Sequence, residues 1–208
     1  MSKFKASKFN QQDVEILNRC LAYAGYFRID AYQLRHKRFD GGWSEARDFE
    51  LFERGHSVAV LPYDPQTDQV VLIEQFRMGA IASDSAWLLE IIAGMVEDGE
   101  SHEDTVRREA VEEACCDLTT LESISNVYVS PGGSSETCQI YCGKVDISTI
   151  KHDYAGLADE GEDIRIHITS YDEAIAALNT GKICSAPAMI GLQWLQLNRA
   201  RLRQQWGP

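Results

Sequence analysis

Three glutamates within one short segment could together bind a divalent cation. Glu109, Glu112 and Glu113 follow a helix start at Ser101, where the pattern Ser-x-x-Asp can cap the first turn through Asp104. Because helical positions three and four apart face the same side, the three carboxylates should project together. Like charges at this spacing oppose helix formation, whereas Mg2+ and Mn2+ prefer carboxylate oxygens and would reverse the effect. The pattern therefore predicts a metal site, and the alternative is a solvated acidic helix face.

The surrounding segment, residues 94–116, carries a longer spaced pattern. It resembles the Nudix box, Gly-x5-Glu-x7-Arg-Glu-U-x-Glu-Glu-x-Gly-U, in which U is apolar. The last glycine of the box is replaced by Cys115, and Cys116 fills the final apolar position. This departure concerns the end of the helix more than the metal site. The matching positions are Gly94, Glu100, Arg108, Glu109, Ala110, Glu112 and Glu113.

The resemblance implies a role for each residue of the box. Arg108 is expected to hold Glu100, so this pair and Gly94 are interpreted as structural. The implied cofactor is Mg2+, with Mn2+ as a substitute and two or three ions in each active site. These ions would bridge phosphate oxygens and lower the pKa of the attacking water. The expected metal ligands are Glu109, Glu113, Glu112, Glu162 and the backbone carbonyl of Ala93.

A second acidic cluster occupies the loop that precedes the last predicted strand, at Asp159, Glu160, Glu162 and Asp163. By composition alone it would be a solvated loop. The box contains no evident general base, however, and in similar enzymes that cleave ADP-ribose an acidic loop at this place supplies one. The resemblance therefore implies that Glu160 activates the water and that Glu162 completes the metal shell. Glu162 is the competing choice of base.

The loop that begins at Ser130 is a third candidate. Pro131 lies 15 positions beyond Cys116, and a proline near this distance resembles a marker of the ADP-ribose branch of the Nudix family. Gly132 would let the backbone approach the terminal ribose of a ligand, and Glu136 is a candidate partner for a sugar hydroxyl. The alternative interpretation is a plain turn between two strands.

Two arginines at strand ends could contact phosphate through their forked donors. Arg54 ends the N-terminal segment and Arg77 ends a strand. Surface arginines are the alternative for both. Tyr26 and Phe27 could be ordinary core residues or a surface on which adenine stacks.

Similar enzymes exchange their N-terminal strands with a dimer partner and thereby help to form its adenine pocket. The resemblance adds Met95 and Glu50 to the predicted substrate contacts. Similar enzymes often have a basic residue just before the acid that corresponds to Glu50, whereas this chain has Phe49 there. The chain is therefore predicted to have two parts. Residues 1–54 would serve in dimerisation and in the adenine pocket, and residues 55–208 would form the hydrolase domain.

Composition narrows the class of protein. The chain has 208 residues, 44% of them hydrophobic, and a formal net charge of −12, which disfavours binding to nucleic acid or anionic membranes. The N-terminus has no apolar signal-peptide core, and none of the six cysteines forms a CxxC pair. We expect a cytoplasmic protein with reduced thiols.

The elements that position these residues follow from periodicity and turn signals. The first 54 residues alternate in polarity and predict a small antiparallel unit too thin to hold its own core. Two helices and the strands around the acidic helix predict a mixed sheet between helical layers, in agreement with the Nudix-type α/β/α sandwich. The predicted later strands are 56–63, 69–77, 87–93, 118–129, 137–145 and 164–168, and the later helices are 171–179 and 188–204.

These features predict a Mg2+-dependent hydrolase that cleaves ADP-ribose to AMP and ribose 5-phosphate. A first alternative is a Nudix pyrophosphatase that prefers another nucleotide sugar, such as GDP-mannose. A second is a nucleotide sensor without turnover, but a sensor would be expected to have lost Glu109 or Glu113, and both are present.

Overall fold

The computed structural model describes residues 8–207, apart from the side chain of Glu160. The chain forms two compact units. The first joins the N-terminal segment, up to Gly55, to the loop Ser130–Glu136, which the predicted boundary at residue 54 does not include. The second contains the remaining residues. Within residues 8–207, no helix is both long and apolar enough to cross a membrane.

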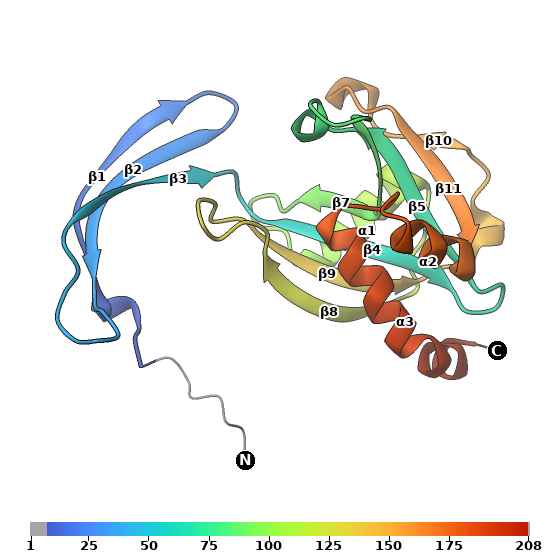
Figure 1. Cartoon of the computed structure of the whole chain (residues 1–208). Coiled ribbons are helices and arrows are strands. Elements are labelled where there is room, and N and C mark those ends of the chain that lie inside the picture. Colours follow the sequence, from blue (N-terminus) through green and yellow to red (C-terminus); the bar gives the residue numbers. More distant parts are fainter. Residues whose placement is uncertain (1–7, 208) are drawn as a thin grey trace, which may run out of the picture. The chain divides into compact units, whose positions relative to one another are not determined.

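The N-terminal unit is a three-stranded antiparallel sheet in the order β1-β2-β3 (Figure 1). None of its described apolar side chains is buried, which agrees with a unit that lacks its own core. The buried residue of this sheet is Asp30, whose carboxylate accepts hydrogen bonds from Arg19 and Arg28. These two guanidinium groups hold the pKa of Asp30 well below its usual range. The elements are η1 Gln11–Asp13, β1 Val14–Ala24, β2 Arg28–His36 and β3 Arg47–Glu53.

The second unit is built on an eight-stranded sheet with the main order β10-β11-β5-β4-β9-β8. β4 and β9 run parallel and the other pairs are antiparallel, which confirms the predicted mixed sheet. The strands on this path are β4 Ser57–Asp64, β5 Gln69–Phe76, β8 Thr120–Tyr128, β9 Thr137–Lys144, β10 Tyr154–Ala155 and β11 Ile164–Ser170.

The segment that was predicted as one central strand, residues 87–93, is two short strands. β4 and β5 pair only next to their turn, at Tyr63 and Asp64. Beyond that point β6 (Trp87–Glu90) pairs with β5, and β7 (Ile92–Met95) pairs with β4. A near-continuous apolar run does not reveal such a change of partner, because both short strands are mainly apolar. The change brings the segment before the acidic helix beside β4.

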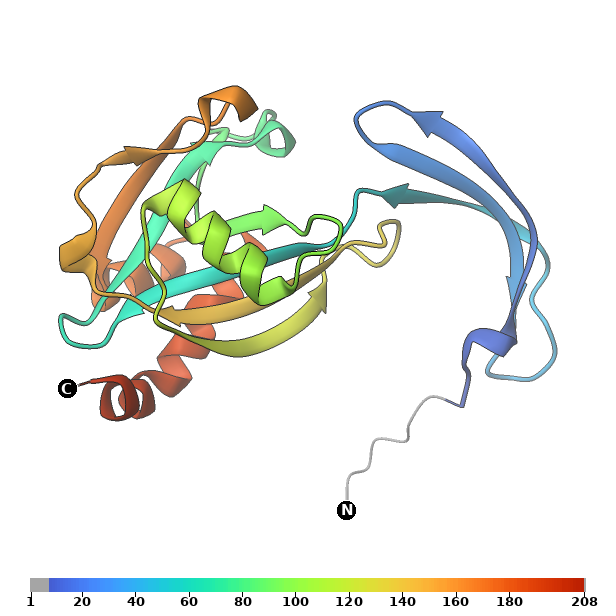
Figure 2. The ribbon, with the colours of Figure 1, turned by 180° about the vertical axis from the view of Figure 1, so that it is seen from behind.

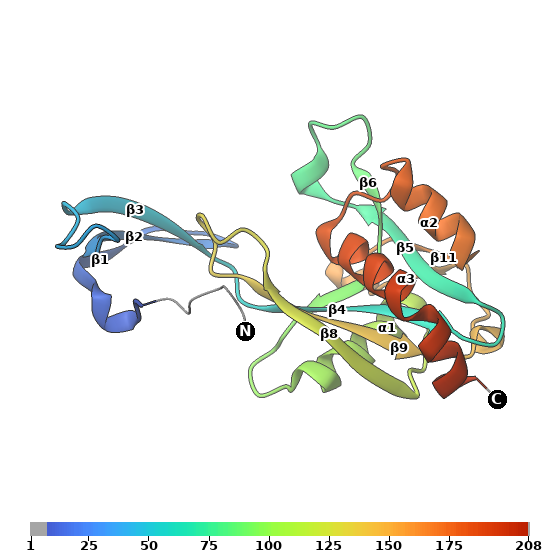
Figure 3. The same ribbon diagram turned by 60° about the horizontal axis from the view of Figure 1, so that its bottom comes forward.

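Helices cover both faces of this sheet, which confirms the α/β/α sandwich. α1 packs on one face, as Figure 2 shows, and its small residues Val106, Ala110 and Ala114 are buried there. α2 and α3 lie together on the other face (Figure 3). The helices are α1 His102–Ala114, α2 Tyr171–Asn179 and α3 Ala186–Trp206, and short 3-10 turns are η2 Met78–Ala80, η3 Ile147–Thr149 and η4 Ala158–Glu160.

The two ends of α1 differ in how well the sequence predicts them. Ser101 caps the first turn, because its hydroxyl accepts a hydrogen bond from the backbone N–H of Asp104. The carboxylate of Asp104 accepts from that same hydroxyl, so the expected reciprocal bond to the backbone is absent from this cap. Cys115 ends the helix in the left-handed conformation, with φ 51° and ψ 33°. This is the position at which the Nudix box has glycine, and a side chain is strained there.

Substituting Cys115→Gly should therefore stabilise the protein. Removing the left-handed strain gains more than glycine loses in chain entropy, and the net gain should be roughly 0.5–1 kcal/mol. Thermal unfolding would measure it as an increase of about 2–3 °C in Tm. Cys115→Ser is the control, because it removes the thiol but keeps the Cβ and should leave Tm near the parental value. An unchanged Tm in the glycine variant would contradict this account.

Candidate functional site

Glu113 is the most buried of the predicted metal ligands. It lies on the last turn of α1 and only 2% of its surface is exposed. The backbone N–H of Ala93 donates to its Oε2 at 3.0 Å, and the amide of Gln75 donates to its Oε1 at 3.4 Å. Burial, with the negative charges of Glu109 and Glu162 nearby, raises the pKa of Glu113 to about 8 even though the Ala93 N–H opposes the rise.

Gly94 is where β7 meets α1 most closely. A Cβ at this position would lie 1.9 Å from Oε1 of Glu109, which no real contact permits. Glycine is therefore required for Glu109 to lie against the strand. Burial raises the pKa of Glu109 as well.

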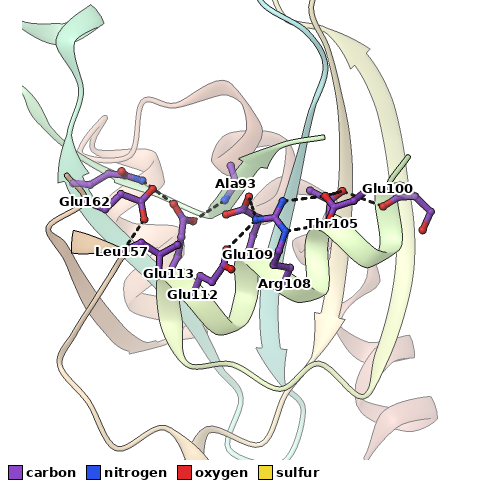
Figure 4. Close-up of polar contacts among 11 residues, drawn as sticks. Ala93, Glu100, Thr105, Arg108, Glu109, Glu112, Glu113, Leu157 and Glu162 are labelled. Atoms are coloured by element: carbon purple, nitrogen blue, oxygen red, sulfur yellow. Dashed lines mark hydrogen bonds and ion pairs between the residues drawn. The ribbon is translucent and has the colours of Figure 1, made fainter. Parts of the chain in front are cut away.

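Arg108 links the loop before α1 to two of the glutamates. Its Nε and Nη2 donate to Glu100 at 3.1 and 3.0 Å, and its Nη1 donates to Glu109 and Glu112 at 2.9 Å each, as Figure 4 shows. The contact between Arg108 and Glu100 is the one that the resemblance implies. Thr105 adds a hydrogen bond to Glu100 at 3.0 Å. These hydrogen bonds, mainly those from Arg108, stabilise the ionised carboxylate and lower the pKa of Glu100 to about 2.

The acidic loop is fastened to the end of α1. The N–H of Gly156 donates to the backbone oxygen of Glu112 at 3.1 Å, and the N–H of Leu157 donates to Oε2 of Glu162 at 3.1 Å. Gly156 has φ 103°, and a Cβ there would come within 2.8 Å of the Cβ of Glu162. Glu162 thus lies on the Glu113 side of the helix (Figure 4). The side chain of Glu160, the predicted base, lies outside the described part of the chain.

The carboxylates of this cluster are suited to a hard divalent cation. Their ligand atoms are all oxygens, which Mg2+ and similar ions prefer. The raised pKa of the buried Glu113 indicates that nearby protein groups do not fully balance its negative charge. Among the described residues, no three Glu, Asp, His or Cys side chains converge closely enough to hold one ion as they stand. One reason is that Arg108 holds oxygens of Glu109 and Glu112. The backbone N–H of Ala93 donates to Glu113, and its carbonyl stays a predicted metal ligand.

Two predicted substrate residues belong to the same unit as the carboxylates. Arg77 follows β5, where its Nε donates to Glu90 at 2.7 Å, and its positive charge favours the ionised form of Glu113. Met95 ends β7, opposite Ser57 of β4.

The other predicted substrate residues belong to the N-terminal unit. Arg54 lies 3.5 Å from the buried Glu136, and its guanidinium lies 5.7 Å from the ring centre of Phe27. Tyr26 packs edge-on against Phe27 and is 97% exposed, so it is not a core residue. Glu50 is exposed on β3. Of the loop residues Ser130, Pro131 and Gly132, Ser130 closes the turn by accepting from the N–H groups of Gly133 and Ser134.

The sequence analysis missed two residues that support the carboxylates. Gln75 contacts Glu113, and Thr105 contacts Glu100. Both are buried polar residues: Gln75 lies on β5 and is 6% exposed, and Thr105 lies on α1 and is fully buried. A polar residue that interrupts a buried row is the signal that could have found them.

The chain is similar to known proteins over most of its length. The NUDIX domain model matches residues 53–189. The ADP-ribose pyrophosphatase of Escherichia coli (strain K12) is 46% identical over 199 residues, which cover 95% of each chain. The Haemophilus influenzae enzyme of the same name is 45% identical, covering 95% of this chain and 93% of that one. The GDP-mannose pyrophosphatase of Cronobacter sakazakii is 31% identical, covering 82% and 83%. A solved structure titled as an ADP compounds hydrolase shares the fold, with a TM-score of 0.70 at 20% identity over 95% of this chain and 98% of that one.

Proposed function

The chain belongs to the Nudix family, and from that premise we propose that it is an ADP-ribose pyrophosphatase, which hydrolyses ADP-ribose to AMP and ribose 5-phosphate. The observation that supports this substrate most strongly is the difference in identity between two groups of relatives. Identity is 46% to an enzyme named for ADP-ribose and 31% to one named for GDP-mannose. A nucleotide sugar other than ADP-ribose remains the second candidate.

Nudix hydrolases use divalent cations, and we propose Mg2+ here, bound by Glu109, Glu112, Glu113, Glu162 and the backbone carbonyl of Ala93. Such ions supply charge neutralisation for the diphosphate and lower the pKa of the attacking water. The protein contributes carboxylates that its own backbone helps to place, because Gly94 admits Glu109 beside the strand and the Ala93 N–H holds the buried Glu113. A cation and Arg108 compete for Glu109 and Glu112, so binding would shift Arg108 toward Glu100.

The substrate contacts are proposed for both units. Arg77 is suited to a phosphate and Met95 lies on the strand that carries Gly94. Tyr26 and Phe27 offer aromatic faces for the adenine, and Arg54 offers a cation for a phosphate. Glu136 can accept from a sugar hydroxyl. Free thiols suit a reducing compartment such as the cytoplasm, and they are found at Cys20, Cys115, Cys116, Cys142 and Cys184.

The direct test is product analysis with purified protein, ADP-ribose and Mg2+. AMP and ribose 5-phosphate should appear, and kcat/KM should be higher for ADP-ribose than for GDP-mannose. Higher kcat/KM for GDP-mannose would reassign the substrate within the family. Absence of turnover for both at micromolar enzyme would contradict the proposed activity.

We also expect a homodimer with exchanged N-terminal strands. The sheet β1-β2-β3 leaves large apolar side chains exposed, including Ile16 at 57% and Leu21 at 59%, and such a surface is unfavourable in water. Size-exclusion chromatography with light scattering should give twice the mass of one chain. Leu21→Glu should shift the protein toward monomer, whereas Asn18→Asp, an added charge at an exposed polar position of β1, should not. A monomeric parent at micromolar concentration would contradict the dimer.

A further inference from the structure

Gln75 is a buried polar side chain in a row of apolar ones. Successive residues of β5 alternate between the two faces of the sheet, and Val71 and Ile73 belong to the core on the α1 face. Gln75 is the next residue on that face and is 6% exposed. Burying an amide is unfavourable unless it forms hydrogen bonds, so an apolar residue would be the simpler choice for the core. Core packing alone therefore does not explain why a glutamine occupies this position.

The side-chain amide of Gln75 points at the carboxylate of Glu113. Its Nε2 donates to Oε1 at 3.4 Å, while the N–H of Ala93 donates to Oε2 at 3.0 Å. Each oxygen of Glu113 thus has one neutral donor. A carboxylate has about four acceptor positions, so roughly two are left for other partners.

We infer that Gln75 is a positioning residue that, together with the backbone of Ala93, fixes the carboxylate of Glu113 for a divalent cation. The inference rests on the proposed function, since it needs Glu113 to be a metal ligand. The neutrality of the donor is important: a lysine or arginine could hold Glu113 equally well but would repel the cation. Arg108, which holds Glu109 and Glu112, has that disadvantage.

The test is Gln75→Met, which keeps the length of the side chain and removes its N–H donors. Loss of a residue that orients a metal ligand commonly weakens metal affinity by about 10–100-fold. We expect Mn2+, titrated into substrate-free protein and followed by electron paramagnetic resonance, to bind at least about 10-fold more weakly. The KM for ADP-ribose at saturating Mg2+ should change little, because Gln75 does not contact the substrate in this proposal.

Ile73→Met is the matched control, because it alters the same face of the same strand without a polar contact to Glu113, and its Mn2+ affinity should stay near the parental value. If Gln75→Met fails to fold, Gln75→Asn is used instead, because the side chain of asparagine is one methylene too short for its amide to reach Glu113. Parental Mn2+ affinity in the folded Gln75 variant would overturn the inference while the proposed function stands. A parent that binds no Mn2+ would overturn the metal site itself.

Discussion

Replacing Glu113 by glutamine should abolish most of the activity while leaving the protein folded. The side chain lies at the centre of the carboxylate cluster and is almost fully buried, so no other group can take its place. Loss of one well-placed electrostatic group in an active site costs roughly 10²–10³-fold in kcat. We expect at least that reduction for ADP-ribose, with a higher Mg2+ concentration needed for half-maximal rate. Steady-state kinetics over a range of Mg2+ concentrations would measure both.

The same substitution should stabilise the metal-free protein. Burial, with the nearby charge of Glu109, raises the pKa of Glu113 to about 8, whereas an unfolded chain gives a value of about 4.3. The folded state therefore keeps a proton that the unfolded state loses, and stability falls as pH rises between these values. In the presence of a chelator, Glu113→Gln should melt at a higher temperature than the parent, by an amount that grows from pH ~5 to ~8.

Glu103→Gln is the matched control for both measurements, because Glu103 is an exposed glutamate on the first turn of the same helix. It should leave kcat, the Mg2+ requirement and the pH dependence of melting near the parental values. Unchanged kinetics in Glu113→Gln would remove Glu113 from the metal site. Equal melting temperatures at pH ~8 would contradict the unfavourable burial of its charge.

The sequence predicted the parts of this fold whose signals are local. The start of α1 at Ser101 and the bounds of α2 follow from caps and periodicity, and both agree with the structure. The change of partner at residue 91 could not be predicted in this way, because it depends on how β4 and β5 separate with increasing distance from the turn beside Tyr63. A hydrophobic pattern indicates that a strand is buried, but it does not indicate which strand lies beside it.

The candidate site also has parts that local sequence signals predict and parts that depend on the fold. The spacing of the glutamates on α1 places them together without knowledge of the fold, and the need for Gly94 follows only from how closely β7 approaches Glu109. Arg108 was expected to hold Glu100, and it also contacts Glu109 and Glu112. One guanidinium with five donors can serve several carboxylates, and only geometry decides how many.

The identity of the general base is the second prediction with a large expected effect. We expect Glu160→Gln to lower kcat by roughly 10²–10⁴-fold, the usual contribution of a positioned acid or base, with ADP-ribose binding retained. Glu162 is already engaged, since it accepts the N–H of Leu157, and its charge lies near enough to Glu113 to raise the pKa of that residue. Glu162→Gln should therefore act mainly on metal affinity. Rapid-quench kinetics and calorimetric binding of ADP-ribose would separate kcat from affinity.

Asp159→Asn is the control within the loop, because it removes one exposed carboxylate beside Glu160 and should have little effect. Reversed results, with Glu162→Gln losing kcat and Glu160→Gln nearly normal, would make Glu162 the base. Glu160 is the base that the resemblance implies, and the contacts of the loop support this choice: the N–H of Gly156 ties the loop to Glu112 of α1, and the N–H of Leu157 gives Glu162 a fixed partner. A base must accept a proton from water during turnover, and the carboxylate of Glu162 already accepts the backbone N–H of Leu157.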